Sequence, residues 1–434
     1  MSGLETVTSS VQDVLIDSLS FQPRPGASYI TARRDTRWFA AGSDTYQSDT
    51  GVKVIRINLT GAPQEWLDPA SVRVSFDLTN KGADVLQPIT GPWAFFSRCS
   101  IRVLGTLVED LQQYGLTYQV FSNGLTEDAR QRELDLNFGG IINPLSCAEE
   151  PEAILPGETR TVTMNLLSGL FSGQSKHLWL SALGPIVIEL ELADAEAPVV
   201  LSTPAAGELA GIPRSNKWQI SNPFVMGSIV DLSPDLINAY TKHLEEGKSL
   251  PYSFGTYATV QHAIADPSNF IVNQSRAFSR LNTIFAVFSK PQTWNDREVN
   301  TFAGKTSGAA NMIQGEDNLE TYISLGGTRY PQYPTQKLAH HRLYYISALG
   351  KLNSDVHTPG TKMRAWRTNR MVLGWDMEKA HSGSGAAFSG LSTRNGDLLT
   401  LFCKNGPAAA TKLTLINHFE VIARISAAGC DLLD

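Results

Sequence analysis

The chain has 434 residues, of which 18% are charged and 42% are hydrophobic, and it carries 35 glycines and 22 prolines. This length suits two domains of roughly 180–200 residues each, and low charge with many turn-forming residues is typical of an all-β protein that hides much of its surface from water. The net charge of −6 gives no strongly basic balance, so direct nucleic-acid binding is not expected, because that function needs many contacts to phosphates.

The first 48 residues differ from the rest of the chain and are expected to form an N-terminal arm. Apolar residues recur there at the spacing of one helix face, which predicts a short amphipathic helix. They include Val7, Val11, Val14 and Leu15. This face can pack on its own domain, or it can reach a neighbouring chain or a membrane, and both interpretations stay open. In the second interpretation, these four residues are the candidate subunit contacts.

Period-two patterns begin near residue 52 and predict strands with one buried face. The segments 55–60 and 72–79 both alternate apolar with polar side chains. Further strands are expected over 101–108, 161–166, 186–192 and 218–230, with a short helix within 109–124. Residues 49–232 are therefore expected to form a first β-domain.

A capped helix is expected over residues 233–247. Ser233 can cap it, Pro234 suits its first turn, and Asp235 favours the positive end of the helix dipole. The apolar residues that follow share one helix face: Leu236, Ile237, Tyr240 and Leu244. Because this helix stands between two β-rich halves, it is predicted to link two domains.

Residues 248–434 again contain strand-like segments separated by loops, as in the first half. The segment Leu281–Phe288 is apolar on both faces, which predicts a fully buried strand. Other strands are expected over 343–349, 371–377, 398–403, 412–416 and 419–425. The segments 292–340 and 378–396 are polar and rich in glycine, and they are expected to be long loops.

Two β-domains of about eight strands each, with long loops inside rather than between them, describe two jelly rolls. The predicted fold class is all-β: two tandem eight-stranded jelly-roll β-barrels joined by a short linker helix, with an N-terminal arm. Long insertions at one end of a barrel can build a tower without disturbing the core.

Motifs for catalysis, metal binding and cofactor binding are missing from the sequence. The eight histidines form no His-X-His pair, and the adjacent His340 and His341 would point to opposite faces of a strand. The four cysteines are Cys99, Cys147, Cys403 and Cys430. Their wide spacing indicates reduced thiols rather than a zinc site. Neither a Gly-X-Ser-X-Gly elbow nor a phosphate-binding glycine loop occurs, so we expect no enzyme activity, no cofactor and no metal.

An alternative function remains open, that of a carbohydrate-binding or glycosidase-like β-sandwich. Trp294, Tyr330 and Tyr333 suit a sugar platform, although such aromatic residues more often cover a core or a subunit seam. A glycosidase would also need two carboxylates facing each other across a cleft. The paired acids Glu149-Glu150 and Glu245-Glu246 give no sign of that arrangement, because such pairs are usually solvated.

Targeting signals and basic patches are weak. Two small basic clusters are interpreted as ordinary surface or subunit contacts: Arg33, Arg34 and Arg37, and Arg364, Arg367 and Arg370. No stretch reaches the ~18 apolar residues of a membrane span, and no apolar signal core follows the first residues. The sequence is expected to give an intracellular product that is not exported by a signal peptide.

Several segments, in their order along the chain, resemble the double jelly-roll major capsid protein family, which links adenoviruses, tailless membrane-containing phages, Polinton-like viruses, virophages and giant viruses. PWAFF at 92–96, followed by IRVLG at 101–105 and VED at 108–110, is similar to a first-barrel strand with an aromatic lead-in, a glycine and an acidic turn. LWLSAL at 178–183 with IVIEL at 186–190 resembles the penultimate strand of that barrel.

The later segments continue the resemblance. Residues 224–231 with the helix at 234–246 look like the last first-barrel strand and its linker helix. WDMEK at 375–379, then 398–403 and 419–425, resemble the closing strands of the second barrel. The resemblance covers most of residues 50–434 as a pattern rather than as one exact motif.

The resemblance implies a structural role in the virion. Three chains would form a homotrimer whose six barrels make a pseudo-hexagonal capsomer of an icosahedral shell, assembled inside the host cell. Long loops would form outer towers, and the N-terminal arm would tie neighbouring capsomers together from below. Minor capsid or vertex proteins would be further partners, as would an inner membrane where the shell encloses one.

Overall fold

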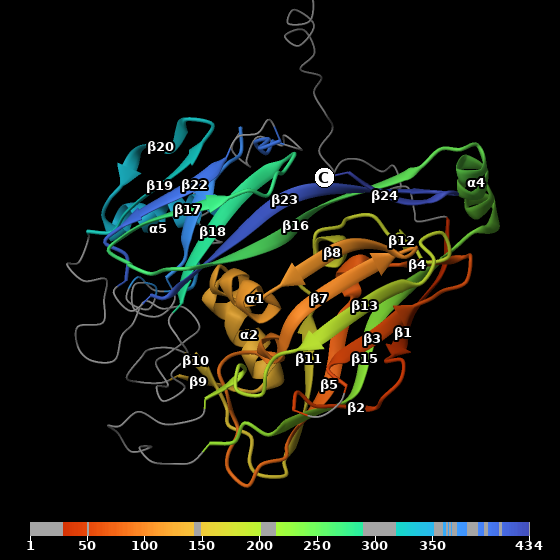
Figure 1. Cartoon of the computed structure of the whole chain (residues 1–434). Helices are drawn as coiled ribbons and strands as arrows, with labels where there is room; N and C mark the ends of the chain where they lie inside the picture. The colour runs from red at the N-terminus through yellow and green to blue at the C-terminus, as the bar shows by residue number, and fades with distance from the viewer. Residues whose placement is uncertain are drawn as a thin grey trace, which may run out of the picture.

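The structure, a computed structural model, describes residues 29–49, 52–142, 149–200, 214–289, 318–350, 359–361, 363, 366, 371–379, 389–394, 398–407 and 410–433. It is built mainly of antiparallel strands, which lie in two groups on either side of Ser233 (Figure 1). No sheet of the described residues combines strands from both groups. One hydrophobic cluster of buried side chains nevertheless extends through both halves of the chain.

The first group contains the strands β1 (Ile30–Phe39), β2 (Thr45–Tyr46), β3 (Val54–Leu59), β4 (Glu65–Leu67), β5 (Arg73–Asn80), β6 (Gln87–Pro88), β7 (Phe96–Val103), β8 (Thr106–Gln112), β9 (Gly140–Ile142), β10 (Glu149–Pro151), β11 (Thr159–Asn165), β12 (Leu178–Trp179), β13 (Ile186–Leu192), β14 (Val199–Val200) and β15 (Trp218–Leu232). Its helices are α1 (Tyr114–Asn123), α2 (Glu127–Asn137) and α3 (Gly169–Ser172).

Eight of these strands form two facing sheets. One sheet has the order β1-β15-β5-β11, with β2, β4 and β12 as short additions, and the other has the order β3-β13-β7-β8. Neighbours in both orders are antiparallel. The alternation in β3 is strict, since Ile55, Ile57 and Leu59 are buried and the residues between them are exposed. This strand order is that of a jelly roll.

The second group contains β16 (Leu250–Ala263), β17 (Asn269–Gln274), β18 (Leu281–Ser289), β19 (Glu320–Leu325), β20 (Thr328–Thr335), β21 (Leu373–Asp376), β22 (Leu399–Lys404), β23 (Lys412–Ser426) and β24 (Gly429–Leu433), with one further helix, α5 (Leu338–Ala348). Its sheets have the orders β16-β23-β18-β21 and β17-β22-β19-β20, and β24 adds to β23.

The two groups therefore repeat one topology. Each strand of the first jelly roll has an equivalent in the second: β1 corresponds to β16, β15 to β23, β5 to β18 and β8 to β20. The helices repeat as well, since α1 and α2 lie between β8 and β11, and α5 lies at the equivalent place between β20 and β21. The predicted fold class of two tandem eight-stranded jelly rolls is confirmed.

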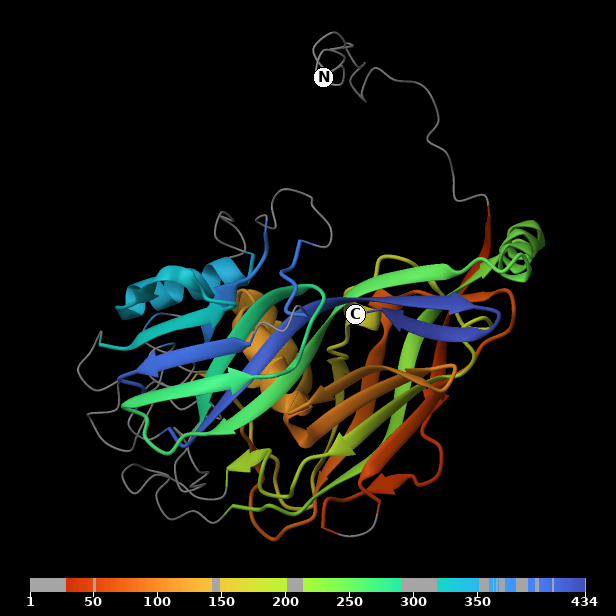
Figure 2. The same ribbon diagram turned by 45° about the horizontal axis from the view of Figure 1, so that its top comes forward.

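Helix α4 (Pro234–Glu245) stands between β15 and β16. Ser233 occupies the position before the helix, but its side chain makes no capping hydrogen bond there. None of the helix residues is fully buried, and Tyr240 contacts the rings of Trp66 and Trp179 at 5.0 and 6.3 Å. The helix thus lies on one end of the first jelly roll, beside the beginning of β1 (Figure 2).

The expectation of an N-terminal arm over residues 1–48 is wrong for residues 30–46, because strands of the first jelly roll lie in this range. Strand β1 pairs with β15 from Ile30 opposite Leu232 to Phe39 opposite Phe224, and β2 pairs with β15 as well. β1 was missed because it is an edge strand that is exposed on nearly all its length. A strand without a buried face carries no period-two pattern to detect.

The segment 343–349 was wrongly predicted as a strand, because it lies largely in helix α5. The buried positions of this helix are Leu338, His341, Tyr345 and Ala348, which follow helical spacing. The expectation of one long loop over 292–340 is wrong in part, since its end contains the hairpin of β19 and β20. Gly326 and Gly327 form the turn of that hairpin, both with positive φ.

Candidate assembly surfaces

Aromatic side chains line the contact between the two jelly rolls. Phe121 of α1 lies 4.5 Å from the ring of Tyr257 on β16 and 5.5 Å from the ring of Phe285 on β18. Tyr257 in turn stacks on His418 of β23 at 5.0 Å. The first jelly roll therefore covers the outer face of the sheet that β16, β23 and β18 form (Figure 1).

Backbone groups approach closely at the same contact. A Cβ atom added to Gly169 of α3 would lie 2.0 Å from the carbonyl oxygen of Gly255 on β16, so no side chain fits there. Polar contacts flank this point, because Thr259 Oγ1 donates to the carbonyl of Gln112 at 2.9 Å and Gln174 Nε2 donates to the carbonyl of Ser253 at 3.3 Å. The outer edge of β16 is thus covered by the first jelly roll.

A buried carboxyl group fixes the loop that makes this contact. Glu109 of β8 is 2% exposed, and it accepts hydrogen bonds from the backbone N–H groups of Gly169 and Leu170 at 2.8 and 3.2 Å and from the hydroxyl of Ser168. Burial raises the pKa of Glu109, and these hydrogen bonds oppose the rise. The carboxyl group therefore positions α3 against β16.

Two histidines of the second jelly roll are largely shielded from water, His341 fully and His418 in part. Burial lowers the pKa of His418, beside Tyr257, to about 4. Burial likewise lowers the pKa of His341 to about 4, although the hydrogen bond between its Nε2 and the carbonyl of Leu319 opposes the shift. Both rings are neutral at pH 7.

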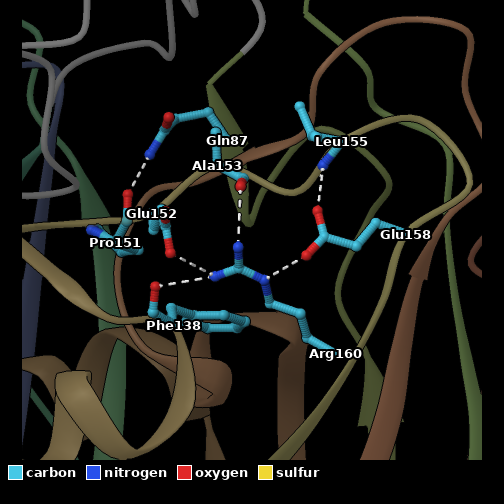
Figure 3. A network of polar contacts seen from close by, with 8 residues as sticks. All are labelled: Gln87, Phe138, Pro151, Glu152, Ala153, Leu155, Glu158 and Arg160. Carbon is cyan, nitrogen blue, oxygen red and sulfur yellow. Dashed lines mark hydrogen bonds and ion pairs between the residues drawn. The ribbon is translucent and has the colours of Figure 1, made fainter.

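An arginine holds the loops at one end of the first jelly roll (Figure 3). Arg160 donates to the carbonyls of Phe138 and Ala153 at 3.0 and 3.3 Å, and it pairs with Glu152 and Glu158 at 3.1 and 3.0 Å. Glu158 also accepts the N–H of Leu155 at 2.8 Å. Gln87 extends the network, since its Nε2 donates to the carbonyl of Pro151 at 2.5 Å. One planar guanidinium thereby joins three loop segments.

Strand β1 and the pair β20 and α5 lie on opposite sides of the molecule (Figures 1 and 2), and each carries exposed apolar side chains. On the first jelly roll, Phe39 of β1 is 68% exposed, and the Arg37 guanidinium lies 5.1 Å from the ring centre of Phe224. On the second jelly roll, Tyr333 of β20 is 60% exposed, and Leu343 of α5 is 49% exposed. Sequence patterns missed the first surface, because it belongs to the unrecognised strand β1.

The predicted subunit contacts Val7, Val11, Val14 and Leu15 lie outside the described residues. Of the predicted basic clusters, the one at 33–37 lies on β1, where Arg34 pairs with Glu65 and Arg33 Nη2 donates to Ser228 Oγ at 3.3 Å. The arginines of the other cluster, Arg364, Arg367 and Arg370, lie outside the described residues, as does Trp294 of the predicted sugar platform.

Within the described ranges, no group of three or more histidine, cysteine, aspartate or glutamate side chains is arranged to hold a metal ion. Cys99, Cys403 and Cys430 are free thiols there. No helix in the described part of the chain is both long and apolar enough to cross a membrane.

Comparison with solved structures shows that the same fold occurs in several viral capsid proteins. PBCV-1 VP54, fitted into a reconstruction of the virophage Sputnik, matches with a TM-score of 0.65 and 11% identity over 95% of this chain and 99% of that chain. The Faustovirus major capsid protein matches with a TM-score of 0.59 and 8% identity over 98% and 94%. The Sputnik virophage structure matches with a TM-score of 0.56 and 9% identity over 98% and 93%.

No model of a known protein family matches the sequence, and no curated protein sequence does. The similarity to solved structures extends over nearly the full length of both chains, so it includes both jelly rolls and their order. The chain thus has the double jelly-roll fold of these capsid proteins, and the resemblance found in the sequence is confirmed for the fold.

Proposed function

We propose that this chain is a major capsid protein of an icosahedral DNA virus and has a structural rather than an enzymatic role. The observation that carries the proposal is the pair of jelly rolls with identical strand order, matched over nearly the whole chain by the Faustovirus major capsid protein and by a chain of the PBCV-1 virus capsid. The location that follows is the virion shell.

Three chains are proposed to form a homotrimeric capsomer, in which six jelly rolls make a pseudo-hexagonal tile. The low charged fraction of 18% supports this, because large permanent interfaces are more apolar than ordinary surface. The exposed apolar residues on two opposite sides of the molecule support it as well, since they give each chain two places to contact its neighbours.

The ends of the jelly rolls suggest how the capsomer is oriented. The insertions around Arg160 lie at one end, and α4 with the start of β1 lies at the other (Figure 1). We place the insertions outside, as towers, and the residues before β1 beneath the shell. There they would contact neighbouring capsomers, minor capsid or vertex proteins, or an inner membrane.

Electron microscopy of the purified full-length protein tests the proposal. We expect particles with a hexagonal outline and threefold symmetry in top views, because six similar domains would surround one axis. Particles of single-chain size without symmetry would contradict it. A parallel glycan-array screen with turnover assays addresses the alternative, and specific glycan binding by an unassembled chain would favour the carbohydrate-binding function instead.

A further inference from the structure

The contact between the two jelly rolls within one chain indicates how two chains could contact each other. Within the chain, the outer face of the sheet β16-β23-β18 is covered by the other jelly roll, through Phe121 of α1 and through the segment that ends β8. The covering elements are thus an edge strand and the helix that follows it. Because both jelly rolls have the same strand order, each half of this contact has an equivalent elsewhere in the molecule.

The equivalent of the covered face is the outer face of β1, β15 and β5, and among the described residues its edge at Phe39 is left open. Register places Phe39 opposite Phe224 and Arg37 opposite Met226 on this face. The ring of Phe39 lies 5.9 Å from that of Phe224 and is 68% exposed. The face therefore presents two aromatic rings beside a guanidinium group, and we call it the β1 face.

The equivalent of the covering elements is the surface formed by β20 and α5, which corresponds to β8 and α1. This surface also has nothing upon it within the described chain: Tyr333 and Leu343 are 60% and 49% exposed. The hydroxyl groups of Tyr333 and Tyr344 lie 2.7 Å apart, which holds the two phenol rings together. We call this the β20–α5 surface.

The chemistry of the two surfaces is complementary. The β1 face offers apolar rings and the cation of Arg37, whereas the β20–α5 surface offers tyrosine rings and a leucine. Arginine binds the faces of aromatic rings, and arginine and tyrosine are enriched at the centres of protein interfaces. The elements that carry the two surfaces lie on opposite sides of the molecule, so they can join copies head to tail (Figures 1 and 2).

We propose that the β1 face of one copy binds the β20–α5 surface of a second copy, in the manner in which the first jelly roll covers the second within the chain. This inference rests on the proposed capsomer and names the residues at its seam: Arg37, Phe39 and Phe224 on one side, Tyr333, Leu343 and Tyr344 on the other. Such a contact is heterologous, and it closes into a ring when the rotation allows.

Charge substitutions test both sides separately. Phe39→Asp and Leu343→Asp should each raise the concentration at which the chain is half assembled by about 30-fold or more, as loss of an interface hot spot does. A matched control is Ile271→Asp on β17, where an apolar residue is also 58% exposed but lies at the other edge of the β20 sheet. That variant should assemble like the wild type.

Mixing the two variants separates a head-to-tail contact from other arrangements. A Phe39→Asp chain keeps an intact β20–α5 surface, and a Leu343→Asp chain keeps an intact β1 face, so the mixture should contain a two-chain species that neither variant forms alone. A cysteine pair gives a second readout: chains carrying both Arg37→Cys and Leu343→Cys should be joined by a short bismaleimide into two- and three-chain products, and either single variant should not.

The outcomes distinguish this inference from the proposed function. A wild-type trimer that persists with Phe39→Asp and gives no cross-links would overturn the named contact and leave the capsid function standing. A wild-type chain that stays monomeric would overturn both. Circular dichroism and thermal unfolding of each variant show whether the jelly rolls remain folded. A loss of assembly by a folded variant then supports the proposed contact.

Discussion

Glu109 shows at the scale of one residue how the chain holds its two jelly rolls together. Its carboxyl group is buried, yet two backbone N–H groups and a hydroxyl group donate to it. The donors belong to Ser168, Gly169 and Leu170, the segment that lies against Gly255 of the second jelly roll. A buried acceptor with several donors is costly to remove, because each donor is then left without a partner.

We therefore expect Glu109→Ala to lower the free energy of unfolding by about 3 kcal/mol, since it strands buried donors. Denaturant unfolding followed by tryptophan fluorescence measures the change. Glu189→Ala is the control, because Glu189 makes long ion pairs with Arg56 and Arg102, at 3.8 and 3.6 Å. That substitution should cost less than about 1 kcal/mol, and equal costs for the two variants would be inconsistent with the role of Glu109.

His418 predicts a dependence of stability on pH. Its pKa in the folded chain is about 4, against an ordinary value of 6.5, so the unfolded chain binds the proton more tightly. The contribution of the neutral ring is complete above pH 6.5 and is lost as the pH falls through 4. The loss amounts to about 3 kcal/mol.

His418→Gln should remove this part of the pH dependence, because glutamine does not titrate. Unfolding curves of both proteins between pH 7 and pH 4 give the comparison, in which the wild type loses stability relative to the variant as the pH falls. His177→Gln, at an exposed position, is the control and should follow the wild type. A constant difference between the wild type and His418→Gln across this range would refute the assignment.

At the scale of elements, the sequence predicted strands well where one face is buried and poorly elsewhere. β3 alternates along its whole length and β13 alternates in its second half, and the positions of both were predicted. β1 was missed because it lies at a sheet edge with its side chains exposed, and the two surfaces proposed to join copies include such edges. Sequence patterns do not reveal surfaces of this kind, because their side chains would be buried only when two chains come into contact.

Helix α5 illustrates a different limit. The segment 343–349 carries adjacent tyrosines and an isoleucine, residues that favour strands. Its buried residues nevertheless follow helical spacing, and Tyr345 packs edge-on against Phe285 of β18 at 6.3 Å. Tertiary packing thus overrides local preference. The repeated topology reveals why a helix stands here, since α1 occupies the equivalent place in the first jelly roll.

The loop network around Arg160 gives a prediction at the same scale. Arg160→Ala should release the segments at Phe138 and Ala153 and lower the free energy of unfolding by about 1–2 kcal/mol, because charge-assisted hydrogen bonds are lost. Amide exchange should accelerate at Glu152 and Leu155. The control Arg56→Ala removes a more exposed arginine with one ion pair, at 3.8 Å, and unchanged exchange in Arg160→Ala would argue against the anchoring role.

At the scale of the whole molecule, contacts within a capsomer and contacts between capsomers are proposed to use different parts of the chain. The β1 face and the β20–α5 surface lie on opposite sides of the molecule, whereas β1 begins beside α4, where the N–H of Ser233 donates to the carbonyl of Tyr29 at 2.8 Å. We propose that the two sides make the contacts within one capsomer. The predicted apolar face of the arm, with Val7, Val11, Val14 and Leu15, is proposed to make the contacts between capsomers.

Deleting residues 1–20 is accordingly expected to leave the trimer intact and to impair assembly into larger shells. The reason is that the deletion removes the predicted apolar helix face and spares β1, which begins at Ile30. Particle imaging of the truncated and full-length proteins under shell-forming conditions gives the comparison. Normal shells from the truncated chain would refute the role of the arm without affecting the trimer.

The most direct measurement is the mass of the full-length protein in solution at micromolar concentration, by native mass spectrometry. A chain of 47.3 kDa that forms the proposed capsomer should appear as a stable species of three chains. Such a species should persist on dilution, because large apolar interfaces dissociate slowly. A species of one chain across the micromolar range would contradict the capsomer and, with it, the proposed function.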